Sequence, residues 1–332
     1  MNKNANHGGM DEKTMLALCR FNIFSSARLV LTPYWTAEAY SFGKYIRRYG
    51  YYPQCLPLCI YTDHGAGRLN HPYEDELNTD APASFYHSPD SVREWKLKSK
   101  KPCYVLYSPA VFYRRTHKIE KSVSSRGTLV FPAHTTVAIE DQCDMEEYIR
   151  QLLELPDRFQ PVSACFHQHD IKKGQHKIFA KYKIPMYTAG HIGDSRFVQR
   201  FYDILRNFSY STSNMIGSYT YYSVEMGIPF FIYGNKQIFI NTLDYNITTG
   251  LFDLYRESES YRRAYDLFLG SRTEITLEQR NLVEKELGMK DGISRSKMAR
   301  VLYFSFIKWL LSAAPLRYTG NLARALISFG RK

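Results

Sequence analysis

The sequence contains no apolar run of about 18 residues, which is the length that a membrane-spanning helix needs. Its first residues, from Met1 to Thr14, are polar and lack the apolar segment of a secretion signal. Among the 6 cysteines there is no CxxC pair, which favours reduced thiols over a disulfide framework. These absences predict a cytoplasmic protein without a membrane span.

Three enzyme signatures are also missing. The chain has no GxxxxGK[ST] stretch, no GxSxG elbow and no HExxH pair. Phosphate-binding P-loops, common serine hydrolases and zincin proteases are therefore excluded as classes.

What the sequence does supply is length, aromatic residues and positive charge. Its 332 residues exceed what one hydrophobic core usually serves, so we expect two domains. The net charge is +12, and the segment from Gly292 to Lys332 carries eight lysines and arginines and no acid. Apolar and aromatic residues at 301–311 predict a helix there that suits an anionic membrane surface. The alternative is a helix packed across both domains, and the two readings can hold together.

Strand and helix patterns alternate along the rest of the chain, which predicts parallel sheets. One helix is expected at 37–49 with Thr36 as its N-cap, and the polar stretch 67–91 is expected to be a long loop. The other expected elements are strands at 28–32, 58–61, 103–107, 128–131, 162–166 and 186–188, and helices at 145–155, 175–183 and 197–207.

Polar residues recur where the expected strands end. Ligands of parallel sheets gather at the carboxyl ends of the strands, so these side chains are candidates for one site. They are Asp63, His64, His134, Thr135, Thr136, His167, His169, Asp170 and His191. Asp63 or His64 could act as a general base, and the imidazoles and hydroxyls suit a phosphate. The pair at 167 and 169 could instead bind zinc, but no second cluster has a matching ligand spacing.

The fullest motif spans residues 211–232. Ser213 and Asn214 end an expected strand, and Ser218 begins a helix that carries Glu225. Small polar residues at a helix N-terminus favour an anion, and Glu225 could accept hydrogen bonds from a ribose. The motif predicts a bound nucleotide with its phosphate, and the alternative is a capped helix with a structural glutamate.

Over residues 28–234 these motifs resemble those of GT-B glycosyltransferases. The finer resemblance is to bacterial sialyltransferase-like enzymes that use CMP-activated acidic sugars to assemble surface polysaccharides. Asp63-His64-Gly65 is similar to their Asp/Glu-x-Gly motif, and Ser213-Asn214 is similar to their Ser motif. Residues 166–170 stand where the family has His-Pro, with the proline missing. The absence of an Asp-x-Asp motif agrees with a metal-independent GT-B mechanism.

The resemblance implies an α/β protein with two Rossmann-like domains that face a cleft. The expected units are an acceptor domain at 20–125, a nucleotide-sugar domain at 126–290 and a basic amphipathic helical tail at 291–332. It also implies an inverting transferase that needs no cofactor or metal. Asp63, His64 and His134 would be catalytic, and the remaining candidates would bind the donor.

The expected partners are a nucleotide-sugar donor, a glycan acceptor linked to lipid, and the anionic inner face of the cell membrane, with no nucleic acid. Two other classes stay open. One is a transferase that moves a polyol phosphate from a CDP donor, and the other is a non-catalytic binder of membrane or nucleic acid.

Overall fold

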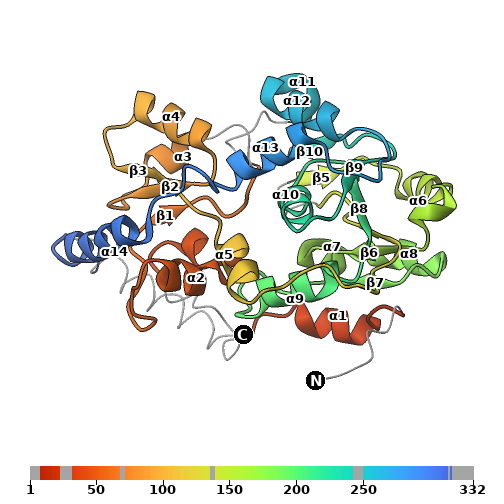
Figure 1. Ribbon diagram of the computed structural model, residues 1–332, viewed down its shortest axis with the longest axis horizontal. Coiled ribbons are helices and arrows are strands. Elements are labelled where there is room, and N and C mark those ends of the chain that lie inside the picture. The colour runs from red at the N-terminus through yellow and green to blue at the C-terminus, as the bar shows by residue number, and fades with distance from the viewer. Residues whose placement is uncertain are drawn as a thin grey trace.

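The computed structural model describes residues 8–22, 32–67, 72–134, 139–241, 250–312 and residue 315. Within these ranges the chain forms two α/β units, each built on a parallel sheet, which lie on the left and right of Figure 1. The strand expected at 28–32 falls almost wholly outside the described residues.

The N-terminal unit holds a parallel sheet of order β1-β2-β3. All residues of β2 are buried, as expected for a strand covered on both faces. Its strands are β1 (Tyr61–Thr62), β2 (Ser84–Tyr86) and β3 (Cys103–Val105), and its helices are α2 (Phe42–Tyr49), α3 (Glu74–Leu77), α4 (Pro89–Lys98) and α5 (Pro109–Thr116), with 3-10 turns at Trp35–Ala37 and Ala39–Ser41.

Two expectations for this unit were wrong. The helix expected from residue 37 begins only at Phe42, because Tyr40 and Ser41 have left-handed backbone angles, with φ of 58° and 64°. The stretch 67–91 is not one long loop, since it includes α3, β2 and the start of α4. Ser88 caps α4 through a hydrogen bond from the Asp90 N–H, with a proline at the first helical position.

The C-terminal unit holds a sheet of order β7-β6-β4-β8-β9, in which all pairs are parallel. The chain starts in the middle at β4, moves outward to β7, and then returns to the other side at β8. Ligands of such sheets bind where this order reverses, which here is between β4 and β8. The strands are β4 (Thr128–Val130), β6 (Val162–Cys165), β7 (Met186–Tyr187), β8 (Tyr210–Ser213) and β9 (Phe230–Ile232).

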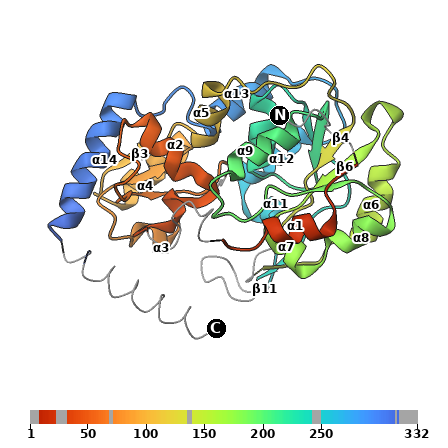
Figure 2. The same cartoon turned by 90° about the horizontal axis from the view of Figure 1, so that it is seen from below.

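Helices and a small antiparallel sheet surround these strands. The small sheet has the order β11 (Gly250–Phe252), β10 (Phe239–Asn241) and β5 (Ile139–Asp141). The helices are α6 (Met145–Leu153), α7 (Gln168–Lys173), α8 (His176–Lys181), α9 (Phe197–Leu205), α10 (Ser218–Glu225), α11 (Leu254–Glu257) and α12 (Glu259–Phe268), with a 3-10 turn at Asp157–Phe159. The first helix, α1 (Glu12–Leu18), also belongs here, because it packs beside α7 and buries Met15 (Figure 2).

The helix α13 (Leu277–Glu286) packs on α10 and α12, and the last described helix, α14 (Arg295–Leu310), returns to the N-terminal unit (Figure 1). Tyr49 donates a hydrogen bond to the Ile293 carbonyl at 2.7 Å, and Met298 and Leu302 of α14 pack near Gly50. One hydrophobic cluster extends through both units, so they share a continuous core.

The predicted α/β fold class with two Rossmann-like units is confirmed by the two parallel sheets. The predicted boundary between residues 125 and 126 falls in the connection from α5 to β4. The exact domain limits and the cleft stay predictions. Among the described residues, no helix combines the length and apolar content that crossing a bilayer requires.

Candidate functional site

The carboxyl ends of β4 and β8 are joined by Asn214. This fully buried amide accepts a hydrogen bond from the Ala133 N–H at 3.1 Å and donates one to Gln237 Oε1 at 2.8 Å. Asn214 thus fixes the loops on both sides of the point where the strand order reverses. We infer that Asn214 shapes the site, because its amide oxygen and its amide nitrogen both already form hydrogen bonds within the protein.

One serine ends β8 and another begins α10. The Ser213 hydroxyl lies 2.9 Å from the Tyr219 hydroxyl and accepts a hydrogen bond from the Met215 N–H at 3.2 Å. Tyr219 stacks on Phe131 with a centroid distance of 4.7 Å. Ser218, the first residue of α10, donates to the Ala66 carbonyl at 3.0 Å. Ser218 therefore reaches across to the N-terminal unit.

The loop after β1 meets α10 at two glycines. A Cβ on Gly65 would lie 2.8 Å from the Ser218 hydroxyl, and a Cβ on Gly67 would lie 2.0 Å from the Tyr221 ring. Gly67 also has φ +77°, which other residues rarely adopt. The Asp63-His64-Gly65 turn and the start of α10, predicted as opposite halves of one site, are thus in contact.

Three histidines gather at the carboxyl ends of β4 and β6. The ring centroids of His134 and His167 are 4.7 Å apart, and those of His167 and His169 are 5.0 Å apart. His64 and His191 lie close enough to act electrostatically on His167. The structure therefore brings five predicted site residues from both units into one region.

Burial favours the neutral form of these three imidazoles. Burial lowers the pKa of His134 to about 4, with a smaller contribution from His169. Burial also lowers the pKa of His167 and of His169 below the ordinary value, and neighbouring cationic or titrating groups add to this. A neutral imidazole donates one hydrogen bond and accepts another, so the group can contact phosphate oxygens without carrying charge.

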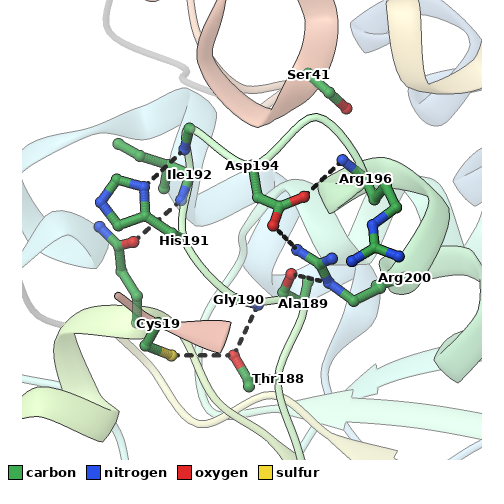
Figure 3. A network of polar contacts seen from close by, with 12 residues as sticks. Cys19, Ser41, Thr188, Ala189, Gly190, His191, Ile192, Asp194, Arg196 and Arg200 are labelled. Carbon is green, nitrogen blue, oxygen red and sulfur yellow. Dashed lines mark hydrogen bonds and ion pairs between the residues drawn. The ribbon is translucent and has the colours of Figure 1, made fainter. Parts of the chain in front are cut away.

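The loop around His191 is held by its own polar contacts (Figure 3). His191 accepts a hydrogen bond from the Gly193 N–H at 3.0 Å through Nδ1, and burial is the main cause that lowers its pKa. Asp194 accepts a hydrogen bond from the Arg196 N–H at 2.8 Å and forms an ion pair with Arg200 at 3.0 Å. Asp170 lies buried in the first turn of α7.

Asp63 pairs with a residue that sequence reasoning missed. Its Oδ1 lies 2.5 Å from His87 Nδ1, and its Oδ2 accepts a hydrogen bond from the His87 N–H at 3.1 Å. His87 follows β2, the short strand hidden in the expected loop. The sequence signal was present in the apolar and aromatic residues of β2, but three residues are too few to show a period. His64 instead lies beside Trp35, with ring centroids 5.2 Å apart.

Glu225 does not face the site. Its carboxylate, 1% exposed, lies at the C-terminal end of α10 and accepts from Arg114 at 2.6 and 2.7 Å and from Arg115 at 3.0 Å. Both oxygens of this carboxylate already accept hydrogen bonds from arginines and are not placed to accept others from a ribose. The expected role of Glu225 in donor binding is therefore withdrawn.

Two further predicted residues, Thr135 and Thr136, lie outside the described residues. Within the described ranges, no three His, Cys, Asp or Glu side chains are grouped so that they could hold a metal ion.

No protein-family model and no curated protein matches the chain. Distant likenesses exist among solved structures. A protein described as a UDP-N-acetylglucosamine 2-epimerase from Listeria monocytogenes has 15% identity and a TM-score of 0.35, over 81% of this chain and 70% of that one. The S. aureus protein MnaA with UDP has 9% identity and a TM-score of 0.34, over 69% and 60%. The pneumococcal O-GlcNAc transferase GtfA with UDP and GlcNAc has 12% identity and a TM-score of 0.31, over 76% and 48%.

Proposed function

We propose that this protein is a glycosyltransferase that moves a sugar from a nucleotide-sugar donor to a glycan acceptor. The observation that carries the proposal is the meeting of the Asp63 loop with the start of α10, beside the histidines. An anion-favouring helix start, neutral imidazoles and a buried carboxylate are what direct displacement at a sugar phosphate requires.

The donor lies against the C-terminal unit in this proposal. His134, His167 and His169 donate hydrogen bonds to the leaving phosphate, as does the Ser213 hydroxyl. The backbone at the start of α10 faces the same negative charge. The acceptor lies on the side of the N-terminal unit, next to the Asp63 loop, and the reaction inverts the anomeric centre without a metal.

We favour a CMP-linked acidic sugar as donor and a lipid-linked surface polysaccharide as acceptor. α14 supplies the membrane contact. One face of it is buried through Met298 and Leu302, whereas Phe304, Ile307 and Leu311 on the other face are 63%, 54% and 85% exposed. The flanking lysines and arginines suit the anionic inner face of the cell membrane.

A donor panel tests the proposal. The purified chain is incubated with CMP-, UDP- and GDP-linked sugars and with CDP-glycerol and CDP-ribitol, and release of the free nucleotide is measured. We expect slow hydrolysis of one nucleotide sugar, with water as the acceptor. If only a CDP-polyol is turned over, the group that the enzyme transfers is a polyol phosphate and not a sugar. No release from any donor would contradict transfer.

A further inference from the structure

Asp63 contacts both the imidazole ring and the backbone N–H of His87. The ring nitrogen Nδ1 lies 2.5 Å from Asp63 Oδ1, and the backbone N–H donates to Oδ2 at 3.1 Å. The two residues directly follow neighbouring parallel strands, β1 and β2, so the sheet itself sets the pair. An ionised Asp63 carboxylate would accept a hydrogen bond from Nδ1, and in that tautomer Nε2 carries the lone pair.

The free nitrogen of this ring is buried. The His87 side chain is 1% exposed, and Nε2 has no hydrogen-bond partner among the described residues. Buried polar atoms nearly always have a partner, so this basic nitrogen is a candidate to accept a hydrogen bond from a ligand hydroxyl.

The pair lies where the two units meet. Asp63 acts electrostatically on Tyr222 of α10 and on Glu286 of α13, both from outside the N-terminal sheet. Ser88, the residue after His87, donates to Glu286 Oε1 at 3.1 Å. The Asp63–His87 pair thus lies beside α13, which packs on α10.

We propose that His87 is the general base of the transfer reaction and that Asp63 positions it. The inference rests on the proposed function. His87 Nε2 takes the proton of the acceptor hydroxyl, and that oxygen forms the bond to the anomeric carbon. The bond from this carbon to the donor phosphate oxygen breaks, and the phosphate leaves with the electron pair. The Asp63 carboxylate stabilises the imidazolium, and His64 has no part in the proton transfer.

Two substitutions of His87 distinguish a role as general base from a purely structural role. The amide of asparagine occupies the place of Nδ1, so H87N retains a donor to Asp63 and removes Nε2. We expect H87N to fold and to release nucleotide on the order of 10²- to 10⁴-fold more slowly than the wild type. H87G is expected to be equally slow and to recover part of its turnover when free imidazole is added.

A matched control comes from another buried histidine. His176 on α8 is 2% exposed and contacts Glu12 Oε1 through Nε2 at 3.2 Å, so H176N tests loss of a buried histidine elsewhere. This variant is expected to keep nucleotide release within about twofold of the wild type. D63N is expected to be slow and to change the pH profile of turnover, because an amide in place of the carboxylate no longer fixes the Nδ1 proton.

A spectroscopic readout needs no variant that could fail to fold. Long-range ¹H–¹⁵N spectra of the wild type, with the His87 signals assigned by their loss in H87N or H87Q, report which ring nitrogen is protonated. We expect a protonated Nδ1 and a bare Nε2 at pH 8. A protonated Nε2 would overturn the proposal.

Calorimetric titration with the nucleotide distinguishes failure of the His87 assignment from failure of the proposed transferase function. If the wild type binds the nucleotide and H87N turns the donor over at the wild-type rate, His87 is not the base and the proposed function stands. If the wild type neither binds a nucleotide nor releases one from any donor, the transferase and its base are both rejected.

Discussion

Glu225 carries a negative charge in the interior, and Arg114 compensates it. The Arg114 side chain is 13% exposed and reaches Glu225 from α5 with two hydrogen bonds. Breaking a buried ion pair by removing one partner leaves the other charge uncompensated, which costs more than the pair contributes. This contact joins the two units at the residue scale.

R114A is therefore expected to lose about 3 kcal/mol of unfolding free energy. R93A is the control, since the Arg93–Asp90 pair is 70% and 45% exposed, and it should change by less than about 1 kcal/mol. Urea unfolding measures both. We expect R114A to bind nucleotide with unchanged affinity below its transition. Loss of binding with unchanged stability would return Glu225 to the donor site.

Glu286 makes stability depend on pH. Burial is the main cause that raises its pKa to about 7, from an ordinary value of 4.5. Between these values the folded carboxyl stays protonated while the unfolded one ionises, so its contribution to stability is complete below pH 4.5 and is lost as pH rises through 7.

E286Q cannot ionise and should escape this loss. We expect its stability relative to the wild type to rise from pH 5 to pH 8 by on the order of 2 kcal/mol. Denaturant unfolding at both pH values gives the difference. E284Q on the same helix is the control for removing one negative charge, as Glu284 is paired with Lys290. An E286Q effect equal at both pH values would show that Glu286 does not titrate in this range.

At the scale of elements, the sequence predicted most of the strands and helices that build the C-terminal sheet. Its strands are short buried segments that alternate with helical patterns, and α10 is closed by a Gly-Ile-Pro turn, so the local pattern was sufficient. The strand β2 was missed because its three residues lie among Asn, Asp, Ser and Pro residues that predict a loop, and His87 was missed with it. The role of Glu225 was misread because Arg114, its partner, is 111 residues away, and no local pattern reports such a contact.

The helix α14 packs on the N-terminal unit, and its contact with a membrane stays a proposal. Met298 and Leu302 bury one face of it against that unit, while the opposite face stays exposed and apolar. Deleting the segment would therefore open the core, so substitutions on the exposed face are the cleaner test of membrane contact.

We expect the double variant F304S/I307S to lose most of its binding to vesicles that contain anionic phosphatidylserine, while its melting temperature is unchanged. Cosedimentation measures binding. S296A, at an exposed position on the same helix, should bind like the wild type. Equal binding by all three proteins would show that this face does not contact the bilayer.

At the scale of the whole molecule, the contact between the two units is sensitive to Gly67. Gly67 and Gly227 both have positive φ, at +77° and +82°, but only a Cβ on Gly67 would meet the other unit, at Tyr221. G227A should cost about 1–2 kcal/mol of backbone strain. G67A should cost clearly more and should also slow turnover, because the displaced loop carries Asp63. Thermal unfolding and nucleotide release check both, and equal losses would mean that this contact does not hold the units together.

The direct test of a nucleotide-sugar site between the two parallel-sheet units is binding of the nucleotide itself. Thermal unfolding is measured with CMP, CDP, UDP and GDP at increasing concentration. We expect one of them to stabilise the protein in a saturable way, by about 2.7 kcal/mol at 100 times its Kd. Unchanged unfolding with all four nucleotides would contradict the transferase account.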